Sequence, residues 1–377
     1  MAGIYIHIPF CNKKCYYCDF YSIAALSKKP VFINALLHEI ELRKNYLSQK
    51  KIQTIYFGGG TPSVLSSYEL QKVLHQITKY YKITDNVEIT LEVNPDDLNK
   101  YYLKEIKSIG INRLSIGIQS FNNEVLKFLN RRHNAGQAIN SVNLAKSSGF
   151  NNISIDLIYG IPNMDIYEWE KTLEKAIKLN IEHISAYHLT IEKNTVFGKM
   201  KKQGKLKEVN EELSWEQFNM LIDVLKNAGF EHYEISNFAK NKYYSKHNTS
   251  YWQQKEYLGL GPSAHSYNLN SRQWNISDVN KYVSFINLNK IAFIKEILTN
   301  KEKYNEYMIT GLRTMWGIDI NYIQQQFGEE YSNYLYKIVD KMPSDLFIKK
   351  FPEVTLSRKG LFQCDAIISK LIVDKAK

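Results

Sequence analysis

The sequence predicts an α/β fold, a partial barrel of six βα units followed by a smaller α+β domain. Short apolar strands alternate with amphipathic helices up to about residue 240, which is typical of parallel βαβ units. Because such connections are right-handed, six successive units curl into a barrel or part of one. Beyond residue 300 the pattern changes to helices followed by two short strands, which resembles a winged helix. These observations divide the chain into a barrel at 1–240, a connecting region at 241–300 and a C-terminal domain at 301–377.

Six segments have the composition of buried strands, and helical patterns separate them. The predicted strands are Ile4–Ile8, Thr54–Phe57, Val87–Glu92, Arg113–Gln119, Ile153–Ile158 and Ile184–Leu189. The predicted helices include one that begins at Pro30, one through Leu70 and Ile77, and the segments Ala138–Ser147, Trp169–Leu179 and Trp215–Lys226. A strand-like stretch at His232–Ile235 then ends the barrel.

The rest of the chain is less regular. From Ser245 to about Lys290 the sequence is rich in Asn, Gly and aromatic residues and has no clear period. The C-terminal pattern predicts helices at 307–312 and 322–327, a hairpin at 346–349 and 354–356, and a final helix at Leu361–Leu371.

Composition favours a folded, cytoplasmic protein. Of the 377 residues 44% are hydrophobic, only four are cysteines, and the N-terminus lacks the features of a secretory signal. No run approaches the roughly 20 apolar residues that span a bilayer. The net charge of +11 is spread over the chain without a compact basic block, so we expect no nucleic acid partner.

The most informative stretch is the loop after the first strand, where Cys11, Cys15 and Cys18 follow C-x3-C-x2-C spacing. Three thiolates this close can hold an iron–sulfur cluster and leave one iron open to another ligand. A zinc site completed by His7 is the alternative, because cysteine spacing alone does not separate the two. The fourth cysteine, Cys364, lies in the last predicted helix and is expected to be an ordinary buried thiol.

Polar side chains stand at the ends of several predicted strands. The run from Gly58 to Pro62 begins with three glycines, so backbone groups can approach a small molecule closely. Glu92, Gln119 and Asp156 follow apolar runs, and buried carboxylates need partners such as an ammonium group or ribose hydroxyls. Arg131 or Arg132 would suit a carboxylate. For each of these residues alone, a structural salt bridge or cap explains the pattern equally well.

Together, these features resemble the radical S-adenosylmethionine (SAM) superfamily, whose signature is the three-cysteine loop with an aromatic residue before the last cysteine, here Tyr17. The resemblance implies a 4Fe–4S cluster on Cys11, Cys15 and Cys18, with SAM bound to its open iron. It implies that the SAM site is formed by Tyr5, Gly59, Thr61, Glu92, Gln119, Arg131 and Asp156.

Several stretches narrow the resemblance to the coproporphyrinogen dehydrogenase-like branch, among them Tyr5–Cys11, Glu92–Pro95 and Ser115–Phe121. That branch holds oxygen-independent coproporphyrinogen III dehydrogenases and HemW-type heme chaperones. The dehydrogenases usually have a fourth cysteine after the motif and an N-terminal extension. Here Cys18 is followed by Asp19, and the first strand begins almost at Met1. The resemblance therefore favours the chaperones, with the dehydrogenase as the alternative.

The chaperones carry an H-N-x-x-Y-W motif, which occurs here at His247–Trp252. The resemblance implies heme as a ligand, with His247 on the iron and Tyr251 and Trp252 against the porphyrin. His265 is a second candidate for the iron. It further implies apo-hemoproteins of the respiratory chain as acceptors, peripheral contact with the inner face of the membrane, and a homodimer. Whether SAM is cleaved, and so whether the protein is an enzyme, is left open.

Overall fold

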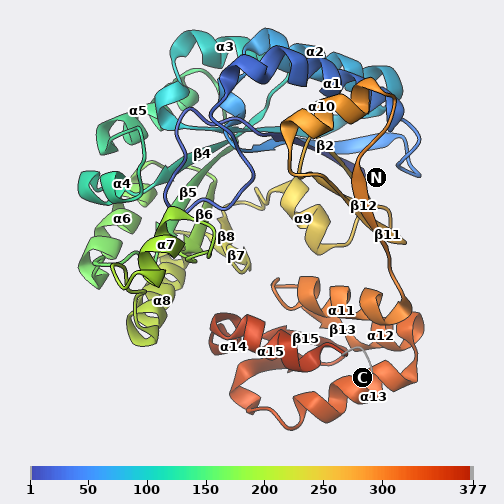
Figure 1. The fold of residues 1–377 in the computed structure, drawn as a ribbon. Helices are drawn as coiled ribbons and strands as arrows, with labels where there is room; N and C mark the ends of the chain where they lie inside the picture. The colour runs from blue at the N-terminus through green and yellow to red at the C-terminus, as the bar shows by residue number, and fades with distance from the viewer. Residues whose placement is uncertain (1, 374–377) are drawn as a thin grey trace.

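The computed structural model describes residues 2–373, and at its centre lies the parallel sheet that the sequence predicts (Figure 1). Six strands run parallel in chain order. They are β1 (Ala2–Ile8), β2 (Lys51–Gly59), β3 (Lys82–Val93), β4 (Arg113–Gln119), β5 (Ile153–Tyr159) and β6 (His183–His188). Each overlaps one predicted segment, so the predicted α/β fold is confirmed.

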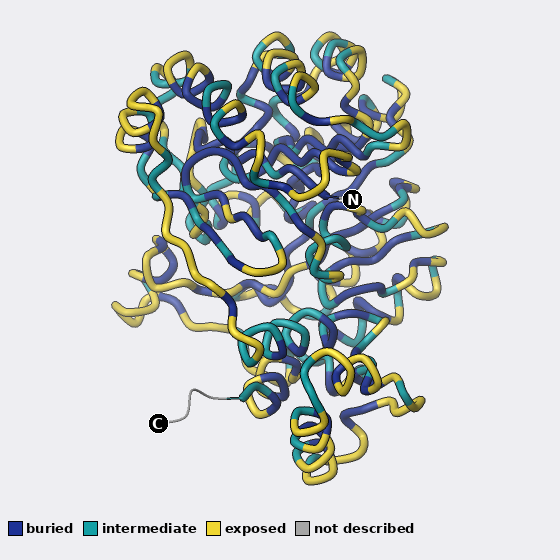
Figure 2. Tube along the Cα trace, turned by 90° about the vertical axis from the view of Figure 1, so that its right-hand side faces the viewer, coloured by how far each residue is buried: buried dark blue, intermediate teal, exposed yellow. Residues whose placement is uncertain are grey.

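Helices follow the strands and cover the outer face of the sheet (Figure 1). They are α1 (Lys29–Leu42), α2 (Ser67–Tyr80), α3 (Lys100–Ser108), α4 (Asn123–Phe128), α5 (Ala135–Ser147), α6 (Ile166–Lys178), α7 (Val196–Lys202) and α8 (Glu211–Asn227). Reciprocal hydrogen bonds between Ser66 and Glu69 define where α2 begins, and those between Asn134 and Gln137 do so for α5. Figure 2 shows buried strands and exposed outer helical turns, so the core lies between sheet and helices.

Six further strands extend the sheet at both ends. They are β7 (Glu231–Glu234), β8 (Asn237–Ala239), β9 (Tyr257–Leu260), β10 (His265–Tyr267), β11 (Ser271–Asn275) and β12 (Phe293–Ile297). The complete order is β12-β11-β10-β9-β1-β2-β3-β4-β5-β6-β8-β7. β9 pairs with β1 in parallel, and β10 to β12 continue antiparallel.

Residues 241–300, which show no clear period in the sequence, are therefore part of the main sheet. Besides four short strands they contain helices α9 (Lys246–Trp252) and α10 (Val279–Asn287). The domain boundaries at residues 240 and 300 stay a prediction.

A buried ion pair ties this extension to the first helix. The Arg43 guanidinium lies 3.1 Å from Oε1 of Glu39, and both side chains are almost completely buried. The Glu39 carboxylate also accepts hydrogen bonds from the Gly261 N–H, the Asn275 amide and the Tyr282 hydroxyl, each at 2.7 Å. Buried charges are stable only when paired in this way, so the network fixes the position of β9–β11 and α10 against α1.

Residues 300–371 build a smaller α+β unit with its own apolar core (Figure 1). Its elements are α11 (Asn300–Gly311), β13 (Ile318–Asp319), α12 (Ile320–Phe327), α13 (Glu329–Val339), β14 (Phe347–Lys350), β15 (Glu353–Leu356), α14 (Arg358–Phe362) and α15 (Cys364–Leu371). The single helix predicted at Leu361–Leu371 is wrong, because two helices meet at Gln363. The first of them packs Gly360 so close to the Leu346 carbonyl that a Cβ there would lie 2.1 Å from its oxygen.

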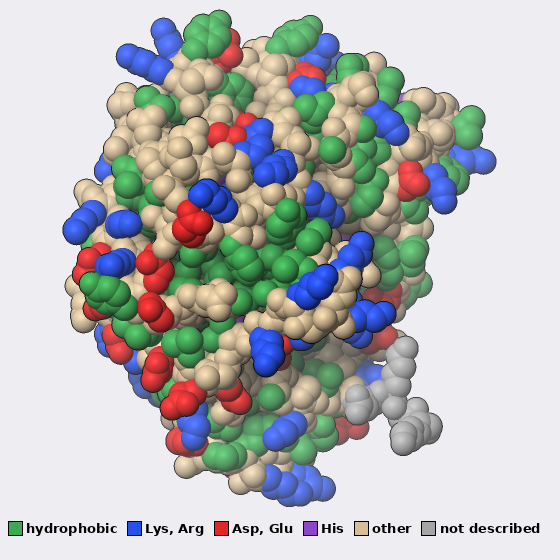
Figure 3. All heavy atoms as spheres, turned by 60° about the vertical axis from the view of Figure 1, so that its left-hand side comes forward, with side chains coloured by type: hydrophobic (Ala, Val, Ile, Leu, Met, Phe, Trp, Pro, Cys, Tyr) green, Lys and Arg blue, Asp and Glu red, His purple; other side chains and the backbone are tan. Residues whose placement is uncertain are grey.

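The surface carries charges of both signs. On the face drawn in Figure 3, lysine and arginine side chains are spread out and mixed with aspartate and glutamate. None of the helices within residues 2–373 combines the length and the apolar composition that crossing a bilayer requires.

Candidate functional site

The three-cysteine loop begins at the carboxyl end of β1, and backbone hydrogen bonds close it. The Cys11 N–H donates to the Ile23 carbonyl at 3.0 Å, and the Ile23 N–H donates to the Pro9 carbonyl at 2.8 Å. Within the loop, the Cys18 N–H donates to the Cys15 carbonyl at 3.3 Å. The closed loop brings the three cysteines to the wall of one pocket of about 380 Å³ at the carboxyl ends of the strands.

Two protein groups donate to the cysteine sulfurs. The Thr61 hydroxyl lies 3.3 Å from Sγ of Cys11, and Nη1 of Arg131 lies 3.3 Å from Sγ of Cys15. Hydrogen bonds of this kind stabilise thiolates, the form that binds iron. No three His, Cys, Asp or Glu side chains within residues 2–373 are grouped as a site for a single metal ion. The fit of an iron–sulfur cluster therefore rests on the spacing, the shared pocket and these two donors.

The same pocket contains six of the seven residues that the resemblance implies for SAM. They are Gly59, Thr61, Glu92, Gln119, Arg131 and Asp156. The seventh, Tyr5, is not in the wall of the pocket. Its ring stacks on that of Tyr56 with centroids 6.1 Å apart, and its hydroxyl lies 3.2 Å from Nδ1 of His7.

The glycine-rich turn brings backbone close to the pocket. Gly59 has φ +107°, and a Cβ added there would lie 2.6 Å from the His7 ring. At Gly60 a Cβ would lie 2.7 Å from the Phe10 carbonyl oxygen. Gly59 therefore requires glycine both for its backbone conformation and for the space, and Gly60 requires it for the space. The Gly59 N–H donates to Oε2 of Glu92 at 3.2 Å, which links the turn to β3.

The two carboxylates of the pocket are half-buried and easily protonated. Burial raises the pKa of Glu92 to about 7. The Tyr56 hydroxyl, which donates a hydrogen bond to Oε1 of Glu92 at 2.8 Å, lowers this pKa and so opposes part of the effect. Burial likewise raises the pKa of Asp156 to about 6, opposed by the Ser115 hydroxyl at 3.2 Å. Carboxyl groups that lose their proton near neutral pH are suited to a cationic ligand that pairs with them.

Three residues around the pocket were missed by sequence reasoning. The Asn94 side chain accepts a hydrogen bond from Nη2 of Arg131 at 2.8 Å. Asn94 directly follows β3, two residues after Glu92, and this position at a strand end is the sequence signal that would have identified it. Tyr56 lies two residues before the glycine turn. Arg113, at the start of β4, is 2% exposed, and its Nε has no hydrogen-bond partner among residues 2–373. Its positive charge lowers the pKa of Glu92 and so works against the effect of burial. No sequence pattern indicated a buried arginine there.

The H-N-x-x-Y-W motif forms most of helix α9, which lies against β1 and β2. Ser245 caps the helix through its hydroxyl, and the Glu88 carboxylate accepts from the N–H groups of Lys246 and His247 at 3.1 and 3.0 Å. The Tyr251 ring packs edge-on against that of Tyr257, with centroids 4.5 Å apart.

The ring of His247 points inward, and both of its nitrogens are engaged. Nδ1 lies 2.8 Å from the Thr54 hydroxyl, and Nε2 lies 2.7 Å from the Tyr251 hydroxyl. The residue is 1% exposed, and burial lowers the pKa of its imidazole to about 3. Its ring stacks on Tyr56 with centroids 5.0 Å apart, and Tyr56 in turn donates to Glu92. In this conformation His247 therefore lies beneath the pocket, and an iron atom reaches neither nitrogen unless α9 moves.

Trp252, His265 and Cys364 do not belong to the wall of the cysteine pocket. Trp252 is half-buried, and its Nε1 has no hydrogen-bond partner in the described part of the chain, residues 2–373. His265, on β10, is exposed and stacks on Trp274 with ring centroids 6.0 Å apart. Cys364 is buried in the C-terminal core, as expected, and burial raises the pKa of its thiol to about 12.

Comparison with known proteins agrees with this geometry. Residues 5–176 match the model of the radical SAM superfamily. A solved structure, the radical SAM enzyme coproporphyrinogen III oxidase (HemN) from Escherichia coli, superposes with a TM-score of 0.84 and 22% identity over 99% of this chain and 90% of its own. At that identity the likeness shows the fold. The fold and the three-cysteine loop together are those of radical SAM proteins.

Similar proteins of known name show to which family within the radical SAM superfamily the chain belongs. The chain is 33% identical to the heme chaperone HemW of Lactococcus lactis over 98% of its length and 97% of the relative's. It is 35% identical to the heme chaperone HemW of Bacillus subtilis over 92% and 91% of the two chains. The chain belongs to the HemW family.

Proposed function

We propose that the protein binds heme and transfers it to apo-hemoproteins, while it holds a 4Fe–4S cluster and SAM. The observation that carries this proposal is the match over nearly the whole length to relatives named heme chaperones. The H-N-x-x-Y-W motif at His247–Trp252 and the cysteine pocket support it. The alternative, coproporphyrinogen III dehydrogenase, has only a likeness of fold in its favour.

In this proposal the residues of the cysteine pocket bind the iron–sulfur cluster and SAM. Cys11, Cys15 and Cys18 would hold the cluster, since three thiolates leave one iron free. Glu92 would pair with the SAM ammonium group, and Arg131 would keep Cys15 in its thiolate form. When both are bound, the cluster and SAM supply one-electron chemistry at the open iron.

The heme partners follow from the same family assignment. We propose apo-hemoproteins of the respiratory chain as acceptors, and peripheral contact with the cytoplasmic face of the membrane as the place of transfer. A homodimer is part of the same proposal. The face drawn in Figure 3 carries charges of both signs.

The test is a titration of the anaerobically reconstituted full chain with hemin, followed by its absorption in the Soret region. We expect saturable binding of one heme per chain, and transfer to an apocytochrome added afterwards. A parallel assay offers coproporphyrinogen III with SAM and a reductant under anaerobic conditions. Decarboxylation without stoichiometric heme binding would overturn the proposal in favour of the dehydrogenase.

The pKa of Glu92 makes a prediction for SAM binding. A carboxylate whose pKa is about 7 in the folded protein is ionised above that pH and protonated below it. We therefore expect SAM affinity to be highest above pH 7 and to fall as the pH is lowered through 7. The variant Glu92→Gln should lose about 1.5–3 kcal/mol of binding free energy, the usual contribution of a hydrogen bond to a charged group.

Equilibrium binding of SAM to the reconstituted protein between pH 6 and pH 8 checks this prediction. The Glu92→Gln variant is the control, because glutamine does not titrate in this range. Any pH dependence of SAM binding that remains in the variant does not come from Glu92. Equal pH profiles for the two proteins would mean that Glu92 does not meet the ammonium group. Iron content measured on both confirms that the cluster is present in each.

A further inference from the structure

A lysine-rich segment crosses the surface next to the three-cysteine loop. Residues 193–207, which include helix α7, contain six lysines and no acidic residue. All six lysine side chains are exposed. They are Lys193, Lys199, Lys201, Lys202, Lys205 and Lys207. A sizeable part of the net charge of +11 is therefore concentrated in this one segment.

The fold attaches this segment to the three-cysteine loop. The Phe197 N–H, in the first turn of α7, donates to the Tyr16 carbonyl at 3.0 Å, and Tyr16 lies between Cys15 and Cys18. The buried Phe197 ring packs against the rings of Tyr16 and Phe128, with centroids 6.0 and 4.7 Å apart. Figure 1 shows α7 beside the loop that follows β1. The lysines of α7 are therefore on the same side of the barrel as the three cysteines.

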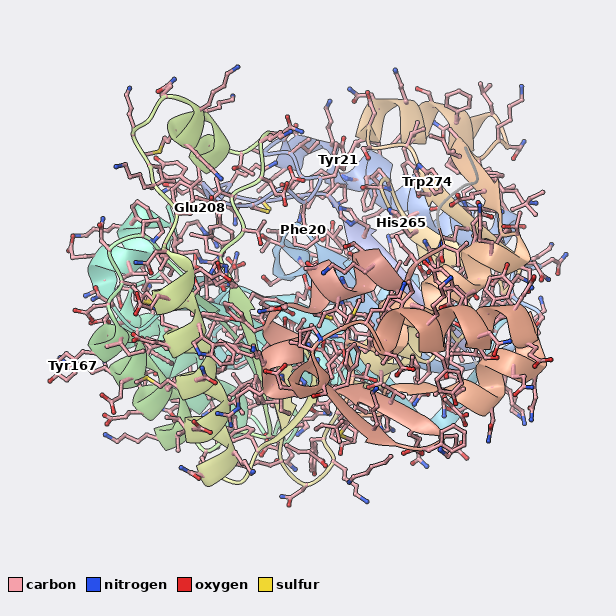
Figure 4. The ribbon with its side chains drawn as sticks, turned by 90° about the horizontal axis from the view of Figure 1, so that it is seen from below. Phe20, Tyr21, Tyr167, Glu208, His265 and Trp274 are labelled. Carbon is pink, nitrogen blue, oxygen red and sulfur yellow. The ribbon has the colours of Figure 1, made fainter. Side chains whose placement is uncertain are left out.

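The loop itself adds two lysines. Lys13 and Lys14 lie between the first two cysteines, are exposed, and belong to the wall of the cysteine pocket. The Lys14 ammonium group donates to the Phe20 carbonyl at 3.4 Å, within the same loop. Figure 4, seen from below, shows Phe20 of this loop and Glu208, just beyond the lysine-rich segment, in the same part of the molecule.

Few acidic groups offset these lysines. The nearest in the sequence are Asp19, Glu192 and Glu208, and Glu208 forms an ion pair with Lys201. Eight lysines, the six of residues 193–207 and the two of the loop, thus face three acidic side chains. We call these eight residues the lysine surface. A surface of one sign attracts partners of the opposite sign and speeds their encounter.

The composition of the lysine surface indicates what kind of partner it fits. A helix that binds a membrane inserts an apolar face, whereas Phe197 of α7 is buried and Met200 is half-buried. Nucleic acid recognition relies largely on arginine, and residues 193–207 contain none. Lysines without an apolar face suit a transient complex with an acidic protein, in which charge guides the encounter.

The position of the lysine surface indicates what such a protein brings. An iron–sulfur cluster takes part in redox chemistry by gaining and losing single electrons. Cys15 and Cys18 are half-buried, so a cluster on them lies near the surface. Phe20, 67% exposed on the same loop, offers an apolar contact beside the lysines. Complexes of electron carriers bury little area and are weak, which matches a charged surface with one exposed aromatic side chain.

We propose that the lysine surface docks a small acidic protein that carries a one-electron donor, a reduced flavin or an iron–sulfur cluster, and that reduces the cluster of the cysteine loop. The carrier is oxidised by one electron and the cluster is reduced by one, and no covalent bond forms or breaks. The inference rests on the proposed function, since it names the partner of the same cluster. It gives a task to α7, whose residues do not belong to the wall of the cysteine pocket.

The test compares two charge reversals of equal size in the reconstituted full chain. The first variant is Lys202→Glu with Lys205→Glu. The control is Lys337→Glu with Lys341→Glu, at the end of α13, and all four lysines are exposed. The probes are a reduced plant-type ferredoxin and a reduced flavodoxin. Rapid mixing measures the second-order rate constant of cluster reduction, and equilibrium titration with the oxidised carrier measures its dissociation constant without electron transfer.

We expect the first variant to lose most of its reaction with the carrier at low salt. Steering by charge raises association rates by about 10- to 1,000-fold, so the rate constant should fall at least about tenfold. The dissociation constant should rise in parallel, while the control stays close to the wild type. The difference should disappear at high salt, since charges are screened within about 3 Å at 1 M ionic strength. Full reduction of the first variant by excess dithionite shows that its cluster is intact.

The outcomes separate this inference from the proposed function. Equal rate constants for the wild type and both variants would overturn the inference, as would equal losses in the two variants or no reduction of the wild type by either carrier. Vesicles of phosphatidylglycerol provide a further arm. Loss of vesicle binding in the first variant, with unchanged reduction by the carriers, would overturn the inference and assign the lysine surface to lipid. Failure of the wild type to assemble a cluster would instead remove the proposed function.

Discussion

Replacing Cys15 with alanine is expected to abolish the iron–sulfur cluster and, with it, the binding of SAM. The loop supplies three thiolates, and its hydrogen bonds to Ile23 and Pro9 hold them at one pocket. With one thiolate missing, two irons lack protein ligands, so the cluster is not retained. Arg131 would then lose the sulfur that accepts from its Nη1 at 3.3 Å. Iron and sulfide analysis after anaerobic reconstitution, together with equilibrium binding of SAM, measures both losses.

The fourth cysteine offers a matched control. Cys364 is a buried thiol of the C-terminal core, on α15, and does not belong to the pocket. Cys364→Ala should therefore keep the full iron and sulfide content and the SAM affinity of the wild type. A Cys15→Ala protein with undiminished iron would contradict the assignment of the loop, and zinc in place of iron in the wild type would restore the zinc alternative.

Removal of Glu39 is expected to have the largest effect on stability. Glu39→Ala leaves the Arg43 guanidinium buried without its carboxylate. It also removes the acceptor of the Gly261 N–H and of the Tyr282 hydroxyl, and one of the two acceptors of the Asn275 amide. Breaking a buried ion pair by removing one partner costs about 3–5 kcal/mol of unfolding free energy. The loss should appear first in hydrogen exchange of β11 and α10, because the network attaches them to α1.

Denaturant unfolding and native-state hydrogen exchange check this prediction. Asn34→Ala is the control, since Asn34 is exposed on the same helix, and surface changes of this kind usually stay within about 0.5 kcal/mol. A loss below about 1 kcal/mol for Glu39→Ala would mean that Arg43 finds other partners.

The parallel strands could be predicted from sequence because each is a continuous buried run. Every residue of Arg113–Gln119 is buried, and helices such as α3 and α6 have clear amphipathic periods. The strands β9–β12 could not be predicted in the same way. Segments of three to five residues such as His265–Tyr267 are too short to show a period. They form because β9 pairs with β1, because β10 to β12 continue the sheet from β9, and because the Glu39 network holds this extension against α1, all of which are tertiary causes.

The cysteine pocket was predictable because its residues lie in motifs at successive strand ends, and parallel strands bring such ends together. That the His247 ring is buried, with both nitrogens in hydrogen bonds, could not be predicted from the sequence. A histidine in a motif is equally compatible with an open coordination site and with a buried hydrogen-bonded ring. Only the fold shows Thr54 and Tyr251 on its two nitrogens. Arg113 was missed for a related reason, since a strand that begins with arginine usually starts at the surface.

The sheet ends at β12, and this has a consequence for how the protein behaves in concentrated solution. All five residues of Phe293–Ile297 are exposed, and within residues 2–373 only β11 pairs with this strand. An edge strand with free backbone N–H and C=O groups and with apolar side chains such as Ile294 and Ile297 is a template for intermolecular pairing. The charges of Lys295 and Glu296 oppose such pairing only in part. Crowding therefore favours strand addition between molecules along this edge. Low ionic strength preserves the repulsion between molecules of net charge +11 and keeps them apart.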